Sequence, residues 1–155
     1  LRLQRQSFDF LVRQLDILHP GLASDRDRFH AAFGKTLYIY LTRPDKLDQA
    51  VSVVKAMQTG LWHQAPAGSE IERLSPPRDP VYDGDEIARE LAELTAYDRQ
   101  WLDWFEAEGI APLRLDYDTL SADPNAALQR VLAALGVDRN LGEGVRPATA
   151  KLADA

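Results

Sequence analysis

The sequence predicts an α/β fold in which a parallel sheet is flanked by helices. Short runs of β-branched and aromatic residues, of which residues 37–42 are the clearest, alternate with stretches whose apolar residues recur every three or four positions. Such alternation is typical of a parallel sheet, because parallel strands need a helical crossover between them. The length of 155 residues suits one domain with its own core, so we expect residues 1–155 to form a single domain.

Two helices are expected before the first strand. Ser7 can cap a helix that runs to Leu18 and stops before the Pro-Gly pair that follows. Ser24 can cap a second helix at Asp25–Phe33, and Gly34 stands where helices often end in a left-handed conformation. The first helix also has an apolar face, formed by Phe8, Leu11, Leu15 and Leu18, whereas the second is predicted from its ends.

The segment of residues 37–63 joins an apolar strand to a long amphipathic helix. Pro44 ends the predicted strand, and Asp45 can cap the helix that follows or lie in its first turn. The apolar face of this helix is predicted to comprise Leu47, Ala50, Val51, Val54, Met57 and Leu61. Arg43 and the positive helix N-terminus both lie at the carboxyl edge of the strand, where α/β folds bind anionic ligands. This segment therefore predicts a phosphate-binding site.

Residues 60–82 interrupt the alternation of strands and helices. They contain several glycines and prolines and predict a long excursion, a type of loop that is usually functional or disordered in compact domains. The remaining predicted elements are short strands at Leu61–Gln64 and 70–74, a helix over 85–107, a strand at 112–115, and a helix at Pro124–Leu135 that Gly136 closes.

Composition excludes several classes of function. The formal net charge of −6 argues against nucleic acid as the main partner, so an anionic ligand must be met by local positive charge. The absence of cysteine excludes disulfides and thiolate metal sites and fits a cytoplasmic protein, and no spacing of ligand residues suggests a metal site. No apolar run approaches the roughly 20 residues of a membrane span. The cations that flank the informative segments are Arg43, Lys46, Lys55, Arg146 and Lys151.

Two stretches within residues 37–63 carry a family resemblance. LTRPDKLDQAVS, which ends at Ser52, and QTGLWH, which begins at Gln58, resemble the PAPS-dependent sulfotransferases, most closely the bacterial carbohydrate branch typified by trehalose 2-sulfotransferase. The resemblance implies a P-loop nucleoside-triphosphate-hydrolase-like sulfotransferase fold, present in part. It also implies that Arg43 and Ser52 grip the 3′-phosphate of 3′-phosphoadenosine-5′-phosphosulfate (PAPS). These two residues are nine apart, one more than in the animal cytosolic enzymes, and the bacterial branch resembles this chain in the longer spacing.

Later stretches extend the resemblance over nearly the whole chain. LRLDYDTLSADP, which ends at Pro124, resembles a second sulfotransferase signature and implies that Tyr117 contacts the adenosine of PAPS. PATAKLAD resembles a basic segment that returns to the cofactor, which implies Lys151 as a further ligand. The residues alone leave simpler roles open, with Tyr117 closing the edge of a core, Lys151 solvated, and Ser52 bonded to a carbonyl one helical turn earlier.

Gln58, Trp62 and His63 are the candidates for binding the acceptor. An aromatic face with polar side chains nearby is what stacking on a sugar and recognition of its hydroxyls require. His63 is also a candidate general base, because imidazole titrates near neutral pH. The simpler alternative is that this Trp-His pair packs at the edge of a loop.

The resemblance implies a sulfotransferase that moves a sulfuryl group from PAPS to a hydroxyl of a carbohydrate or glycolipid acceptor. In this family a strand-loop-helix that cradles the 5′-phosphosulfate, and the carboxylate proposed as general base, precede the matched stretches. Nothing in this chain matches them, so we expect it to be the C-terminal portion of the domain, with catalytic residues unassigned. The alternative is a non-catalytic nucleotide-binding or interaction module, whereas a kinase is disfavoured because GxxxxGK[ST] is absent. The sequence does not decide whether the molecule forms a homodimer.

Overall fold

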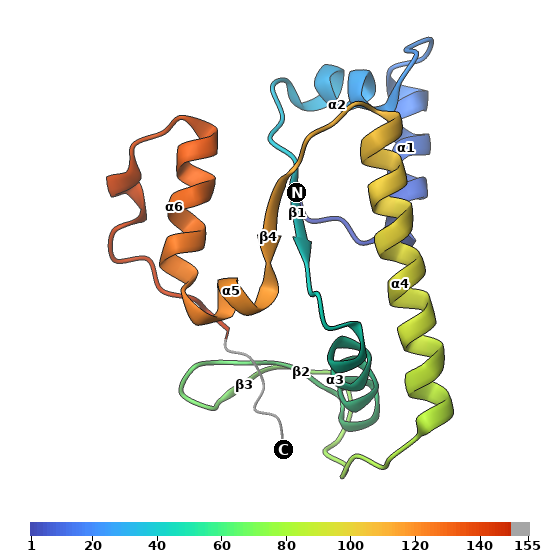
Figure 1. Cartoon of the computed structure of the whole chain (residues 1–155), viewed down its shortest axis with the longest axis vertical. Helices are drawn as coiled ribbons and strands as arrows, with labels where there is room; N and C mark the ends of the chain where they lie inside the picture. Colours follow the sequence, from blue (N-terminus) through green and yellow to red (C-terminus); the bar gives the residue numbers. More distant parts are fainter. Residues whose placement is uncertain (150–155) are drawn as a thin grey trace. The chain divides into compact units, whose positions relative to one another are not determined.

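A computed structural model describes residues 1–149, with residue 139 described by its backbone only (Figure 1). The helices are α1 (Arg5–Leu18), α2 (Asp25–Phe33), α3 (Lys46–Thr59), α4 (Gly84–Ala107), α5 (Tyr117–Ala122), α6 (Pro124–Leu135) and the 3-10 helix η1 (Arg139–Gly142). The strands are β1 (Ile39–Thr42), β2 (Leu61–Gln64), β3 (Glu70–Arg73) and β4 (Leu113–Asp116).

The described chain divides into two compact units. One holds residues 1–40 and 96–114, and the other holds residues 41–95 together with those from 115 on. β1 and β4 pair and point the same way, and each contributes its first half to one unit and its second half to the other (Figure 1). β2 and β3 form a separate antiparallel hairpin. The prediction of an α/β chain with a parallel sheet and helices is therefore confirmed.

The core of the first unit is aromatic. Phe8 and Leu15 of α1 and Phe29 of α2 are buried, and Trp101 and Trp104 of α4 pack against them. Both indole rings meet the ring of Phe8 edge to face, with ring centroids 4.7 and 4.8 Å away. This geometry brings the positive edge of one ring to the negative face of another. Three helices are joined through this cluster.

The ends of the first two helices test the predicted caps. The Ser24 hydroxyl accepts a hydrogen bond from the Asp27 N–H at 3.1 Å, and Gly34 ends α2 with a φ of 72°, so both caps of α2 are confirmed. The predicted start of α1 at Ser7 is wrong, because the helix begins at Arg5. Ser7 lies inside the first turn, where its hydroxyl donates to the Gln4 carbonyl at 3.1 Å instead of capping.

β1 is shorter and more exposed than its composition predicts. It begins at Ile39, and the alternating faces of the strand differ, since Tyr40 is buried while Ile39 and Leu41 are exposed. The ring of Tyr40 meets that of Phe105, with centroids 5.6 Å apart. The sequence is apolar along the whole predicted strand, but the burial of β1 is confined to one face. A strand that is covered on one face only shows this period of two.

α3 follows β1 after a single turn. The Asp45 carboxylate caps it by accepting the Asp48 N–H at 2.8 Å, as predicted. Ala50 and Val54 are buried, but Leu47 and Met57 are exposed, so the buried stripe is narrower than the apolar pattern predicts. Leu61 does not belong to this helix, because α3 ends at Thr59.

Gly60 ends α3 and starts the hairpin. Its φ of 74° is left-handed, a conformation that glycine adopts without strain. A side chain here would also collide with Ser75, because a Cβ would lie 2.8 Å from the Ser75 carbonyl oxygen and closer still to its backbone nitrogen. The predicted strand at Leu61–Gln64 is confirmed, and its partner ends at Arg73, one residue before the predicted end.

The C-terminal elements follow their capping residues closely. Asp123 caps α6 by accepting the Ala126 N–H at 2.9 Å, and Gly136 closes this helix with a φ of 69°, so the prediction of Pro124–Leu135 is confirmed. α5, between β4 and α6, is a short helix that the sequence analysis missed. Among the helices of residues 1–149, none combines the length and the apolar character that crossing a bilayer requires.

Candidate functional site

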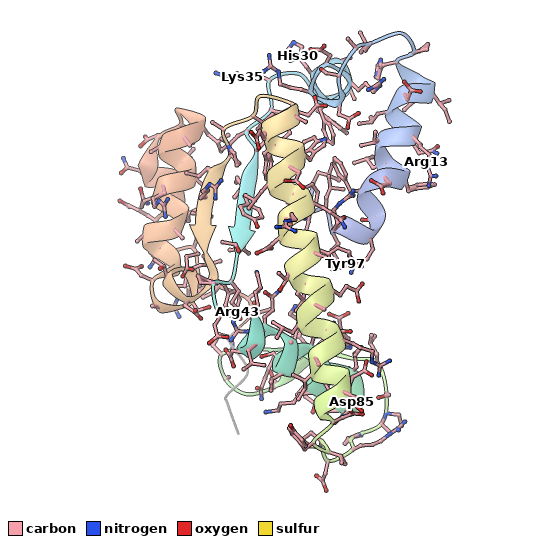
Figure 2. All side chains as sticks on the ribbon, turned by 45° about the vertical axis from the view of Figure 1, so that its right-hand side comes forward. Arg13, His30, Lys35, Arg43, Asp85 and Tyr97 are labelled. Atoms are coloured by element: carbon pink, nitrogen blue, oxygen red, sulfur yellow. The ribbon has the colours of Figure 1, made fainter. Side chains whose placement is uncertain are left out.

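Arg43 is the centre of the candidate site. It lies where β1 gives way to α3 (Figure 2), and it is buried, with only 8% of its surface exposed. Its Nη2 forms an ion pair with the Asp48 carboxylate, and its Nη1 donates to the Ser52 hydroxyl at 3.3 Å. Its Nε is buried and has no hydrogen-bond partner among residues 1–149. A buried guanidinium with spare donor capacity is suited to holding an anion.

Ser52 lies on the face of α3 that meets Arg43. Its hydroxyl donates to the Asp48 carbonyl one turn earlier, at 2.9 Å, and accepts from Arg43. The simple back-bonding role and the proximity to Arg43 therefore occur together. Arg43 and Ser52 are nine residues apart in the sequence. The chain between them turns at Asp45, which caps α3, and this turn lets the two side chains meet.

Tyr117 joins Arg43 from another part of the chain. It is the first residue of α5, directly after β4, and the Arg43 guanidinium carbon lies 5.1 Å from its ring centroid. At this distance the cation is attracted to the face of the ring. Three of the four residues predicted to bind the cofactor are therefore brought together. Lys151, the fourth, lies outside the described residues.

Asp116 fixes the start of α5 and so the position of Tyr117. Its carboxylate accepts the Thr119 N–H at 2.8 Å as the helix cap. The hydrogen bonds that it accepts from Thr119 and from the Asp118 backbone lower the pKa of Asp116 below its ordinary value, because they favour the charged form. The Asp-x-x-Thr pattern was the signal in the sequence for this short helix.

Other charges surround the start of α3. The Lys46 ammonium donates to the Gln49 side chain at 3.1 Å and to the Thr42 hydroxyl at 3.4 Å, while Asp45 and Asp48 add two carboxylates to the first turn. Sequence analysis did not single out Asp48. Its position one turn before Ser52 was the available signal, because residues four apart share one helix face.

The three residues predicted to bind the acceptor, Gln58, Trp62 and His63, have different surroundings. Gln58 lines a shallow hollow with Val54, Met57, Asp83 and Glu86, and its side-chain oxygen accepts the Val81 N–H at 2.9 Å. Neither Trp62 nor His63 lines this hollow. Of the three, this hollow therefore includes Gln58 alone.

His63 and Trp62 lie on β2 of the hairpin. His63 is paired in register with Glu72 of β3, and the imidazole Nδ1 lies 2.5 Å from the Glu72 carboxylate. Trp62 is half-buried, at a register irregularity between Leu61 and His63. The Glu72 contact was missed because the register of two short strands is not visible in the sequence. Within residues 1–149, no three histidine, aspartate or glutamate side chains converge as a metal would require.

Comparison with known proteins shows the family to which the chain belongs. Residues 1–155 match the Stf0 sulphotransferase family, and the chain belongs to this family. It is 34% identical over 107 residues to trehalose 2-sulfotransferase of Mycobacterium tuberculosis, an alignment that covers 68% of this chain and 37% of the relative. It is also 34% identical over 105 residues to trehalose 2-sulfotransferase of Mycolicibacterium smegmatis, with 66% and 36% covered. The matched region thus spans little more than a third of each of these relatives.

Proposed function

We propose that this chain belongs to a carbohydrate sulfotransferase and supplies its grip on the nucleotide of PAPS. The observation that carries the proposal is the convergence of Arg43, Ser52 and Tyr117 at the end of β1, in a chain of the Stf0 sulphotransferase family. The same convergence supports a sulfotransferase fold of the P-loop type, in which this sheet edge faces the nucleotide.

Each of the three side chains has a distinct role in this proposal. The Arg43 guanidinium forms charge-assisted hydrogen bonds to the 3′-phosphate, which its fork of donors matches. The Ser52 hydroxyl turns from the Asp48 carbonyl to donate to the same phosphate. The Tyr117 ring lies on the adenosine side, and its contact with Arg43 helps to hold the guanidinium in place.

The reaction is transfer of a sulfuryl group from PAPS to a sugar hydroxyl. The hydroxyl oxygen attacks sulfur, a new S–O bond forms, and the bond to the bridging oxygen of the nucleotide breaks. The hydroxyl proton passes to a base, and negative charge develops on the departing nucleotide. A firm grip on the 3′-phosphate contributes by positioning, since it fixes sulfur in line with the acceptor.

We further propose that the acceptor is a disaccharide of the trehalose type, which the names of both relatives suggest. Trp62 supplies an aromatic face on β2 for a sugar ring, and His63 supplies a polar edge beside it. Gln58, at the end of α3, is the third candidate for this side of the site.

The test is calorimetric titration of the full-length protein with 3′,5′-ADP and with 5′-AMP. Arg43→Ala should weaken binding of 3′,5′-ADP by about 1.5–3 kcal/mol, the cost of losing a charge-assisted hydrogen bond, and should affect 5′-AMP much less. Arg99→Ala is the matched control, because Arg99 is an exposed arginine on α4. Equal losses for both nucleotides would contradict the assignment of the 3′-phosphate to Arg43.

Transfer itself is tested with radiolabelled PAPS and a panel of disaccharides. The expected product is trehalose, or a related disaccharide, that carries the labelled sulfate group. Nucleotide binding without transfer to any sugar would favour the alternative, a non-catalytic nucleotide-binding module.

A further inference from the structure

The carboxylate of Asp48 forms an ion pair with Nη2 of the Arg43 guanidinium. We propose that Asp48 is a built-in competitor of the 3′-phosphate, which it replaces on Arg43 in the empty site and from which it must withdraw when the nucleotide binds. This inference rests on the proposed function and adds a residue that sets the affinity for the nucleotide.

The first support is the unequal exposure of the two partners. The Arg43 side chain is 9% exposed and that of Asp48 is 38% exposed. Arg43 is held in addition by Ser52 and by the Tyr117 ring, whereas the Asp48 side chain is partly exposed to solvent. When an anion arrives, the carboxylate can therefore leave while the guanidinium stays in place.

The second support is that the Asp48 backbone is fixed independently of its side chain. Its N–H donates to the Asp45 carboxylate at 2.8 Å, and its carbonyl accepts the Ser52 hydroxyl at 2.9 Å. Rotation about the side-chain bonds of Asp48 consequently moves the carboxylate without unwinding α3. A side chain in the first turn of a helix can do this at small cost.

The third support is electrostatic. A buried guanidinium without a counter-ion is strongly unfavourable, so an empty site needs an anion on Arg43. Asp48 supplies one negative charge there, whereas a phosphate carries about 1.5 to 2 and offers three oxygens as acceptors. In the proposed complex the phosphate also accepts from the Ser52 hydroxyl, which in the empty site donates to the Asp48 carbonyl. Replacement of Asp48 by the phosphate is therefore favourable. The free energy gained is smaller than it would be if the nucleotide bound to an unpaired arginine.

One consequence concerns the product. The 3′-phosphate is present in PAPS and in the 3′,5′-ADP that remains after transfer, so Asp48 lowers the affinity for both. After displacement, its carboxylate lies near the bound phosphate and repels it. Asp48 thereby speeds release of the spent nucleotide, a step that limits turnover in many enzymes.

The alternative role for Asp48 is to position Arg43, and it makes the opposite prediction. If Asp48 competes with phosphate, Asp48→Asn in the full-length protein should tighten binding of 3′,5′-ADP about fivefold, the size that a partly exposed ion pair supports. Binding of 5′-AMP should be unchanged. If Asp48 only positions Arg43, the same variant should weaken binding of 3′,5′-ADP, and that result would overturn the inference.

Asp45→Asn is the matched control. It removes one negative charge at the start of the same helix, and asparagine still caps a helix, but the Asp45 carboxylate accepts the Asp48 N–H, whereas it is the Asp48 carboxylate that forms the ion pair with Arg43. Its effect on 3′,5′-ADP should therefore be clearly smaller than that of Asp48→Asn. Equal tightening by both variants would show a general charge effect and would also overturn the inference.

A measurement on the unaltered protein covers the case in which the variant does not fold. The carboxyl ¹³C resonance of Asp48 should shift on saturation with 3′,5′-ADP and stay in place with 5′-AMP. An unchanged resonance in a saturated complex would show that Asp48 remains on Arg43 and would reject the inference, leaving the proposed function intact. If the unaltered protein shows no preference for 3′,5′-ADP over 5′-AMP, the proposed function itself fails, and the inference fails with it.

Discussion

The Arg43 guanidinium lies against the face of Tyr117, with 5.1 Å between the guanidinium carbon and the ring centroid, although the two residues come from distant parts of the sequence. The contact joins the turn after β1 to the turn after β4, which pair as parallel strands. Two strand ends at one sheet edge thus contribute to the same site, as α/β folds commonly arrange their ligands.

This contact predicts different effects for two changes at Tyr117. Tyr117→Ala should weaken binding of both 3′,5′-ADP and 5′-AMP, because the proposed contact is with the adenosine that they share. Tyr117→Phe should retain most of the affinity, because its ring still attracts the cation, an interaction worth about 0.5–2 kcal/mol. Calorimetry on the two variants checks this, and a loss confined to 3′,5′-ADP would assign Tyr117 to the phosphate instead.

The hairpin predicts an effect on the acceptor. Trp62→Ala should raise the KM for the disaccharide and leave the KM for PAPS nearly unchanged, because the ring is proposed to contact the sugar only. Steady-state kinetics of the full-length enzyme with each substrate varied in turn measures both constants. Ile71→Ala, at an exposed apolar position on the neighbouring strand β3, is the control. A defect for PAPS would move Trp62 to the nucleotide side.

Gly60 predicts a test of stability that needs no ligand. Gly60→Ala should lower the free energy of unfolding by more than the roughly 1–2 kcal/mol that a left-handed alanine costs, since the new Cβ also collides with Ser75. Gly136→Ala is the matched control, because Gly136 has a similar φ of 69° with no atom within 4 Å of an added Cβ. Denaturant unfolding of both variants separates strain from collision, and equal losses would argue against the Ser75 contact.

Asp116 predicts a pH dependence in the acidic range. Its pKa is lowered in the folded chain by the hydrogen bonds that it accepts, so its contribution to stability is present above the ordinary pKa of aspartate. This contribution is lost as pH falls through the lowered pKa. The carboxyl ¹³C titration of Asp116 should therefore have its midpoint below that of an unstructured aspartate.

The variant Asp116→Asn separates the charge from the cap. Asparagine caps a helix without titrating, so the variant should lose the Asp116 share of the acid dependence of stability while α5 stays formed. A midpoint at the ordinary value for aspartate in the unaltered protein would contradict the cap geometry.

The features that the sequence predicts well are those set by neighbouring residues. Ser24, Asp45 and Asp123 each bond a backbone N–H within the next turn, so the caps of α2, α3 and α6 could be predicted from a few residues. The exposure of Leu47 and Met57 could not, because it depends on what packs against α3 and not on the helix itself. Ile39 and Leu41 are exposed for the same kind of reason.

The same distinction between local and long-range features applies to the candidate site. Arg43, Ser52 and Tyr117 were predicted from short stretches that resemble a family, and the chain does bring them together. The side chains of Asp48 and Glu72 were missed, because their interest lies in contacts with other residues, which the sequence does not show. The Asp48 carboxylate matters through the Arg43 guanidinium, and the Glu72 carboxylate through a cross-strand pair with His63.

α3 also fixes a distance within its unit. Ser52 lies in the middle of α3. Gly60 ends this helix, β2 begins at the next residue, and Trp62 is the second residue of that strand. An inserted residue between them would lengthen the helix by about 1.5 Å and rotate the hairpin by about 100° relative to Ser52. The length of α3 therefore sets the spacing between Ser52, which is proposed for the donor side, and Trp62, which is proposed for the acceptor side.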